Sequence, residues 1–372
     1  MRINKIVAFS LVIAMTIGLT GCDFLQSLFG GEDPDDSDPL YADNVVVIED
    51  SVTASAVWNE GKVYYINGTV SVSSGMTLTL EAGTIVKFGP DGSLAIGDGA
   101  TIKANGTATK PVIFTSARDV SAGGDSLLTD AVTAAAKGDW NYVWAQTGSN
   151  SNVFTYCTFR YAGKNGYAAL YVDGASTVDH CIFNDNLCGL PYGIDEATLD
   201  ARSAETGTSI TNNLFYSNTW PLAIAETMGL DASNIFEFDH DSSASTASFK
   251  NTHQAVYIHA NGNISNSIAW AETDVPFCVF DDIGVDNGGT LTIQSGVVLK
   301  FSGSGSGLSI YTGGALNRTG AILTSYRDDD ALGDTNADGT ASTASEADWE
   351  GLWIDSLDGY QPDDAYLKYS YY

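Results

Sequence analysis

The sequence has few basic residues. Only 16 of its 372 residues are Lys or Arg, whereas 46 are Asp or Glu, so the formal net charge is −30. Proteins that bind nucleic acid use clusters of Lys and Arg to displace the counterions of the phosphates, and this sequence has no such cluster. We therefore expect no nucleic-acid partner. The acidic excess instead suits divalent cations and solubility outside the cell.

Cysteine is also scarce, with five residues in the whole chain. This number does not fit a disulfide-rich scaffold. Glycine, by contrast, is abundant at 39 residues, and Thr, Ser, Val and Ile are frequent. Such a composition is typical of short strands that are joined by tight turns.

The first residues have the features of a secretory signal. A short basic start precedes an apolar run from Ile6 to Leu19, which is too short to span a membrane comfortably. The next motif, Leu19-Thr20-Gly21-Cys22, resembles the lipobox of bacterial lipoproteins. The resemblance implies that residues 1–21 are a signal peptide, and that lipid on Cys22 anchors the protein to a membrane of the bacterial cell envelope.

The stretch from residue 22 to residue 43 has a composition of its own. It is acidic, contains Pro and Gly, and has few apolar residues. This composition predicts a disordered tether between the lipid and a folded part over residues 44–372. In some bacterial groups an Asp at the position of Asp23 retains a lipoprotein at the inner membrane. Because that rule varies, the sequence leaves the membrane and the leaflet open.

A short pattern recurs in the middle of the chain. Its clear copies run from Phe154 to Phe159, from Val178 to Phe183 and from Ile210 to Phe215, and a weaker copy ends at Phe249. Alternation at period two inside short segments, with turns between them, predicts strands. Stacking of the copies would place Phe on Phe, Asn186 on Asn218 with Thr252 next, Cys157 on Cys181 with Asn213 next, and Leu190 on Leu222 and Val256.

Coils of this kind resemble the right-handed parallel β-helix of pectin-lyase-like proteins. The resemblance implies an all-β solenoid from about Val45 onward. In such a stack, neighbouring cysteines on parallel strands are badly oriented for a bridge, so we expect Cys157 and Cys181 to be buried free thiols.

A longer pattern occurs twice. The segment Thr77–Phe88, followed later by Asp139-Trp140, recurs as Thr290–Phe301 followed by Asp348-Trp349. This predicts a tandem duplication with units of about residues 55–163 and 267–372, in one continuous solenoid or in two. The last residues, 367–372, match Phe154–Phe159, so the chain would end on a strand, either as a truncated member or with an edge that pairs with a partner.

The second unit carries an acidic motif. Its core of Asp334, Asn336, Asp338 and Gly339 has the pattern D-x-N-x-D-G and resembles EF-hand-type and dockerin-like calcium loops. The resemblance implies calcium as a cofactor. The implied ligands are Asp328, Asp330, Asp334, Asn336 and Asp338. Ser345 stands where these loops have their twelfth-position Glu, so a solvated acidic loop is the alternative.

Motifs of the enzymes that share this fold are missing. The sequence has no paired-Arg motif of pectate lyases, and none of the Asn-Thr-Asp, Gly-His-Gly and Arg-Ile-Lys motifs of pectinase-type hydrolases. Asp239-His240-Asp241 could form an acid/base cluster, but it lies in a Ser/Ala-rich stretch typical of a surface loop. We therefore assign no catalytic residue.

Aromatic residues suggest a third kind of function. Trp144, Tyr171 and Tyr257 fall on or near predicted strands, where they either stack on sugar rings or fill the core. The sequence favours a lipid-anchored, non-enzymatic β-helix protein that binds polysaccharide or another surface, with unknown binding residues. The alternatives are a polysaccharide lyase or glycoside hydrolase with an unfamiliar site, and a structural or adhesive envelope protein.

Overall fold

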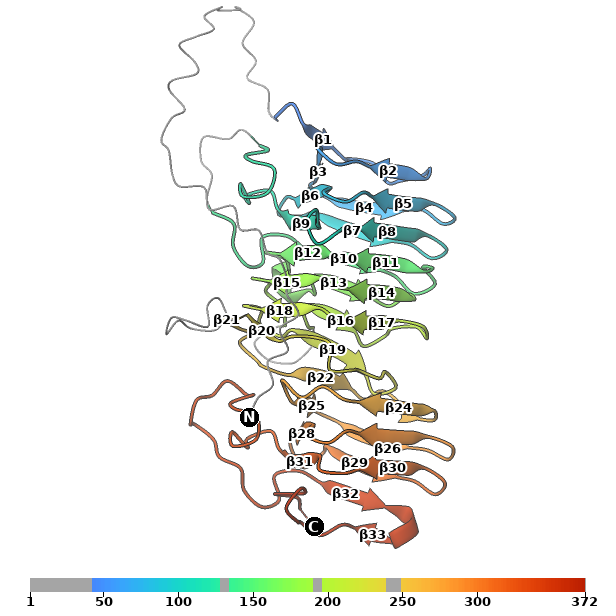
Figure 1. Cartoon of the computed structure of the whole chain (residues 1–372), viewed down its shortest axis with the longest axis vertical. Coiled ribbons are helices and arrows are strands. Elements are labelled where there is room, and N and C mark those ends of the chain that lie inside the picture. The colour runs from blue at the N-terminus through green and yellow to red at the C-terminus, as the bar shows by residue number, and fades with distance from the viewer. Residues whose placement is uncertain (1–41, 128–133, 190–195, 239–248, 372) are drawn as a thin grey trace, which may run out of the picture.

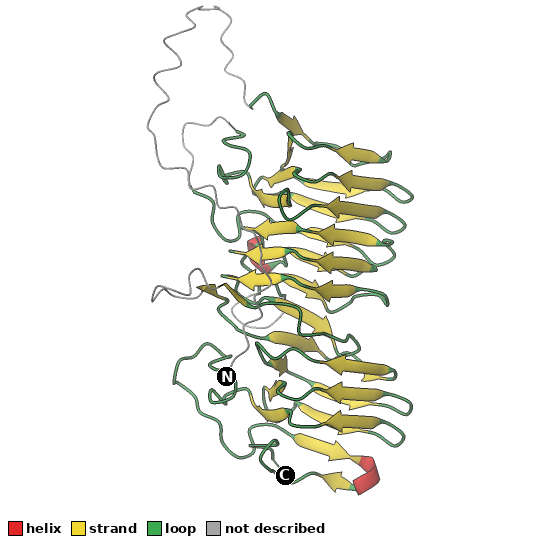
Figure 2. Ribbon diagram, viewed as in Figure 1, coloured by secondary structure: helices red, strands yellow, loops and turns green. Residues whose placement is uncertain are grey.

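The computed structural model describes residues 42–127, 134–189, 196–238 and 249–371. These residues form stacked coils of short strands that pair in parallel (Figure 1; Figure 2). The predicted all-β parallel solenoid is thus confirmed. Cys22 and almost all of the predicted tether lie outside the described residues. Within the described ranges, no helix is both long and apolar enough to cross a membrane.

Three parallel sheets form the first coils. The seven-stranded sheet contains β1 (Val45–Val47), β3 (Val63–Ile66), β6 (Ile85–Phe88), β9 (Val112–Ser116), β12 (Cys157–Arg160), β15 (Ile182–Asn184) and β18 (Leu214–Tyr216). The six-stranded sheet contains β2 (Ala56–Trp58), β5 (Thr77–Leu80), β8 (Thr101–Asn105), β11 (Asn152–Thr155), β14 (Ser176–Asp179) and β17 (Ser209–Thr211).

The third sheet has ten strands and continues through both halves of the molecule. It contains β4 (Thr69–Val72), β7 (Ser93–Ile96), β10 (Val143–Ala145), β13 (Leu170–Val172), β16 (Leu199–Ala201), β19 (Leu222–Ala225), β22 (Val256–His259), β25 (Phe277–Val279), β28 (Val298–Phe301) and β31 (Ile322–Ser325). Because every neighbouring pair in this sheet is hydrogen-bonded, the two units form one continuous solenoid.

The later coils add smaller sheets. The five-stranded sheet contains β23 (Asn263–Ile264), β26 (Asp282–Val285), β29 (Gly307–Ile310), β32 (Gly351–Ile354) and β33 (Gly359–Tyr360). The three-stranded sheet contains β24 (Ser267–Trp270), β27 (Thr290–Ile293) and β30 (Ala315–Arg318), and β20 (Glu237–Phe238) pairs with β21 (Phe249–Lys250). The 3₁₀ turns are η1 (Lys164–Gly166) and η2 (Asp355–Leu357).

The inner face of the seven-stranded sheet carries a stack of phenylalanines. Phe159, Phe183 and Phe215 stack with ring centroids 5.0 Å apart, as the repeat predicted. The next ring is Phe236, at 5.2 Å from Phe215. The predicted fourth copy ending at Phe249 is therefore wrong: Phe249 is 47% exposed and lies in the short antiparallel pair, because Asn234 and Phe236 already occupy the next rung.

Two side-chain ladders satisfy the turn amides between the coils. In one, Asn186 accepts from the Ala162 amide at 2.9 Å and donates to Asn218 at 3.0 Å. The next member is Asn251, which accepts from Asn218 at 3.0 Å, and not the predicted Thr252. Each buried amide thus replaces a backbone partner that the turn lacks.

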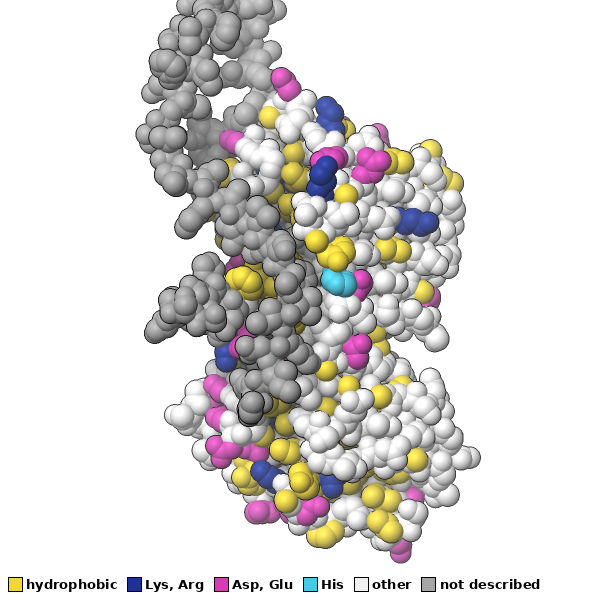
Figure 3. Space-filling view, in the orientation of Figure 1, with side chains coloured by type: hydrophobic (Ala, Val, Ile, Leu, Met, Phe, Trp, Pro, Cys, Tyr) yellow, Lys and Arg dark blue, Asp and Glu magenta, His cyan; other side chains and the backbone are white. Residues whose placement is uncertain are grey.

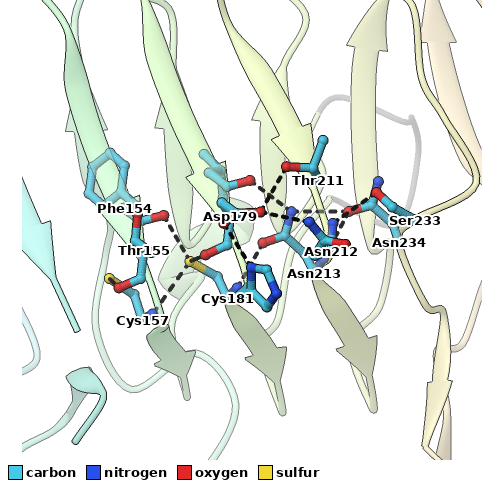
Figure 4. Close-up of polar contacts among 12 residues, drawn as sticks. Phe154, Thr155, Cys157, Asp179, Cys181, Thr211, Asn212, Asn213, Ser233 and Asn234 are labelled. Atoms are coloured by element: carbon cyan, nitrogen blue, oxygen red, sulfur yellow. Dashed lines mark hydrogen bonds and ion pairs between the residues drawn. The ribbon is translucent and has the colours of Figure 1, made fainter. Parts of the chain in front are cut away.

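The second ladder contains the cysteines (Figure 4). Cys157 donates its backbone N–H to Cys181 Sγ at 3.4 Å, and the Cys181 N–H donates to Asn213 Oδ1 at 2.8 Å. Both thiols are buried and free, as predicted. A thiol and an amide oxygen therefore serve as equivalent acceptors on successive rungs.

The last described residues pair with a different strand from the one that the sequence match predicted. Leu367 bridges Leu323 of β31, as Phe159 of β12 pairs with Phe114 of β9. Residues 367–371 therefore correspond to the segment that begins at Phe159, and the match to Phe154–Phe159 is wrong. Before this segment, β33 turns back and pairs antiparallel with β32, because η2 reverses the chain.

Candidate functional site

The predicted calcium residues lie in the loop between β31 and β32. Asp334 accepts the backbone N–H of Asp338 at 3.2 Å and that of Gly339 at 2.8 Å. Asn336 donates to Asp338 Oδ2 at 2.9 Å, and Asp338 also accepts from the Ala341 amide. These contacts make Asp334, Asn336 and Asp338 one compact turn, as the motif implies, with its oxygens already used within the loop.

The other two predicted ligands lie apart from this turn in their contacts. Asp328 is 3% exposed and accepts from the Thr324 hydroxyl at 2.6 Å, so its carboxylate holds the start of the loop. Asp330 is exposed. Among the described residues, no group of three or more His, Cys, Asp or Glu side chains is arranged to hold a metal ion. The calcium site stays a prediction, centred on Asp334, Asn336 and Asp338.

The same loop is docked on the ten-stranded sheet by Thr335. Lys300 of β28 donates to Thr335 Oγ1 at 2.8 Å and to the Gly333 carbonyl at 2.7 Å. His253 Nδ1 lies 3.1 Å from the Thr335 carbonyl oxygen. Burial lowers the pKa values of Lys300 and His253, while nearby acidic groups act in the opposite direction. The later part of the sheet's outer face is thus covered by the acidic loop.

The earlier part of the same outer face carries aromatic side chains. Strand pairing aligns Trp144 of β10 with Tyr171 of β13 and with Asp200 of β16, while their neighbours Val143 and Leu170 point into the core. Since side chains alternate across a strand, these three residues face outward on successive rungs about 4.8 Å apart. The row is a candidate binding surface.

The ring of Tyr142 contacts the other aromatic rings on this surface edge to face, and Trp144 and Tyr171 are tilted against each other. Tyr142 lies 6.1 Å from Trp144 and 5.7 Å from Tyr171 between ring centroids, and Trp144 lies 5.9 Å from Tyr171. Tyr167, which is 40% exposed, packs at 5.2 Å against Tyr142. These contacts hold the rings as one partly exposed apolar platform outside the solenoid core.

Charged side chains surround the platform. The Trp144 indole N–H donates to Asp173 Oδ2 at 2.7 Å, and the Tyr171 hydroxyl accepts from the Ala168 amide at 3.1 Å. Arg202 Nε donates to both oxygens of Asp200, at 3.0 and 2.8 Å. Arg202 Nη2 lies 3.4 Å from Glu196 Oε2 and 2.7 Å from Asp200 Oδ2. We call these residues, with Tyr142, the aromatic–acidic face.

The carboxyls of this face are perturbed. Burial raises the pKa of Glu196 to about 7, and the Asp200 charge adds to this effect, whereas Tyr171 and Arg202 oppose it. Burial also raises the pKa of Asp173 against the stabilising hydrogen bond from Trp144. Near neutral pH, Glu196 therefore exchanges its proton readily and can donate as well as accept a hydrogen bond.

Sequence reasoning identified only the aromatic part of this surface. It proposed Trp144 and Tyr171 but missed Asp173, Glu196, Asp200 and Arg202. The predicted rung placed Leu190 beside Leu222, whereas Leu199 occupies that rung and Leu190 lies outside the described residues. With Leu199 facing inward, Asp200 must face outward, so alternation on the corrected register would have found it. Asp239-His240-Asp241 also lies outside the described residues.

The stacked coils and long parallel sheets define the class of protein as a parallel β-helix. Residues 50–177 match the family model described as pectate-lyase like beta helix domain. This match confirms the resemblance to pectin-lyase-like proteins that the repeats predicted. No curated protein and no solved structure matches the chain significantly.

Proposed function

We propose that this protein is a lipid-anchored component of the bacterial cell envelope that binds polysaccharide through the aromatic–acidic face. The observation that supports this best is the juxtaposition of Trp144 and Tyr171 with Asp173, Glu196, Asp200 and Arg202 on an outer sheet face. Aromatic faces pack on the C–H surfaces of sugar rings, and carboxylates and guanidinium groups bind sugar hydroxyls. An extended parallel sheet offers several such rungs to one chain.

Binding rather than cleavage is favoured by the arrangement of the two carboxyls. Glycosidases separate their catalytic carboxyls by roughly 5 Å or more, which leaves room for the sugar or a water molecule. Glu196 and Asp200, in contrast, are both contacted by Nη2 of Arg202, at 3.4 and 2.7 Å. Two carboxyls that are bridged by one guanidinium group in this way cannot lie on opposite sides of a glycosidic bond.

The binding proposal is tested with residues 44–372 on immobilised polysaccharides. We expect Trp144→Ala to weaken retention at least tenfold, which corresponds to about 1.4 kcal/mol. Trp353→Ala is the matched control, because Trp353 also donates its indole N–H to a neighbouring Asp, Asp355, at 2.6 Å but lies on β32. Equal retention of both variants and the wild type would contradict the proposal.

The anchoring proposal concerns Cys22 and is tested separately. The full precursor should incorporate labelled palmitate and sediment with membranes, because acylation of this Cys follows from the lipobox-like motif. Cys22→Ala should abolish both. Incorporation that persists in this variant would show that the anchor lies elsewhere.

A further inference from the structure

The aromatic–acidic face contains three acidic side chains and one basic side chain. Asp173, Glu196 and Asp200 lie around the aromatic rings, and Arg202 is the cation of the group. On the side of the molecule shown in Figure 3, Lys and Arg side chains are few and scattered. A negatively charged ligand at the aromatic–acidic face would meet three acidic side chains and one basic side chain, in keeping with the net charge of −30.

The guanidinium group of Arg202 is already engaged by the protein. Its Nε donates to both Asp200 oxygens, and its Nη2 contacts Asp200 at 2.7 Å and Glu196 at 3.4 Å. A ligand carboxylate that approached the Nε and Nη2 atoms would have to break a bidentate pair whose Asp200 side chain is 4% exposed. That would leave the buried carboxylate without its partner, which is strongly unfavourable.

Sugar hydroxyls make no such demand. They donate to the carboxylate of Asp173 and accept from a protonated Glu196, without the removal of Arg202 from Asp200. Burial also raises the pKa values of Glu196 and Asp173, which shows that this environment disfavours negative charge. The same environment would disfavour a negatively charged ligand. The face thus suits hydrogen-bonding groups that carry no charge.

From this geometry we infer that the ligand of the aromatic–acidic face is an uncharged polysaccharide and that polyuronates are rejected. This inference rests on the proposed binding function and specifies its ligand. It separates the chemistry of this face from that of a site built to neutralise uronates, which needs unpaired bases or a bound cation beside the sugar.

The test compares retention of residues 44–372 on three immobilised probes: an uncharged β-glucan or mannan, polygalacturonate, and chitosan as a cationic chain. We expect retention on an uncharged chain, lost in Trp144→Ala, and changed less than about twofold between roughly 50 and 500 mM salt, because no ion pair is formed. We expect no retention on polygalacturonate at any of these salt concentrations.

A charge variant makes the inference sharper. The double substitution Asp173→Asn and Glu196→Gln keeps shape and hydrogen bonding but removes two acids, so measurable retention on polygalacturonate should appear at low salt, where the wild type shows none. Wild-type retention on polygalacturonate or chitosan that is lost in Trp144→Ala would overturn the inference and leave the binding function standing. Retention of no probe by the wild type would overturn both.

Discussion

The two units of the solenoid share the same framework of contacts around their long loops. Phe88 stacks on Trp140 with ring centroids 4.2 Å apart, and Phe301 stacks on Trp349 at the same distance. In each unit a Ser donates to the Asp before this Trp at 2.6 Å, and an Arg contacts that Asp at 3.1 Å. The paired residues are Ser116, Arg118 and Asp139 in the first unit and Ser325, Arg327 and Asp348 in the second.

The units differ in what holds their loops. In the first, Arg160 forms an ion pair with Asp119 at 2.6 Å, and within the described part of the chain Lys87 donates to one partner, the Gly124 carbonyl, at 2.6 Å. In the second, Lys368 stands where Arg160 does and forms no ion pair with Asp328 within the described residues. Lys300 compensates with two partners, Gly333 and Thr335.

The sheets that carry these equivalent strands also differ. β6 belongs to the seven-stranded sheet, whereas its counterpart β28 belongs to the ten-stranded sheet. In Figure 1 both loops nevertheless project on the same side of the solenoid. The repeated sequence therefore determines the local framework, while the coils between the units determine which sheet the equivalent strands join.

The largest expected effect tests whether the two Phe–Trp pairs, whose ring distances are equal, contribute equally to the free energy of unfolding. Trp140→Ala and Trp349→Ala each remove a fully buried ring, which costs about 3–5 kcal/mol. We expect Trp140→Ala to cost more in urea unfolding, because coils stack on both sides of it. An equal decrease in the free energy of unfolding for both variants would mean that the local Phe–Trp pair alone determines the stabilisation.

The next effect tests the two loop lysines. Lys300→Met should destabilise the protein by about 3 kcal/mol and Lys87→Met by about 1.5 kcal/mol, because each removes buried charged hydrogen bonds and Lys300 has two partners. Urea midpoints give both values. A larger loss for Lys87→Met would show that partner number does not decide the difference.

Lys87 also predicts a pH dependence. Burial lowers its pKa from 10.5 to about 8, so the folded state binds fewer protons than the unfolded state between these values. Stability should therefore rise as the pH increases from about 8 to 10.5, by no more than about 3 kcal/mol, and by less where solvent screens the charge. The slope should be absent from Lys87→Met, and its persistence there would assign it to other groups.

Glu196 predicts the opposite slope. Its folded pKa of about 7 lies above the ordinary value of 4.5, so the folded state holds the proton more tightly. Stability should fall as the pH rises from about 4.5 to 7, by up to about 2 kcal/mol after allowance for solvent screening, and Glu196→Gln should remove this dependence. Identical pH profiles for the wild type and the variant would contradict the raised pKa.

The smallest expected effect concerns calcium and only the second loop. Calcium at ten times its Kd should add about 1.4 kcal/mol, seen as a rise in Tm of a few degrees that EDTA reverses. Asp334→Asn should abolish the rise, whereas Asp125→Asn in the corresponding first loop should not. A Tm that does not change when EDTA is added would contradict the calcium prediction.

The repeats predicted much of the fold because they report local alternation. The rungs of Phe159, Phe183 and Phe215 and the paired Cys157 and Cys181 followed from spacing alone. Predictions failed after insertions, at Phe249, at Leu190 and at the last residues. An insertion of unknown length leaves the alternation within a strand intact but hides which rung the strand joins.

The sequence by itself determined the parallel solenoid, its duplication and the inward rows, because each follows from a residue pattern that recurs within a coil. Only the tertiary structure decided that Glu196, Asp200 and Arg202 join Trp144 and Tyr171 outside the ten-stranded sheet. It also decided that Thr335 covers the later part of that sheet. These contacts join residues from different coils, and the register between coils is set by hydrogen bonding and packing, which no local pattern records.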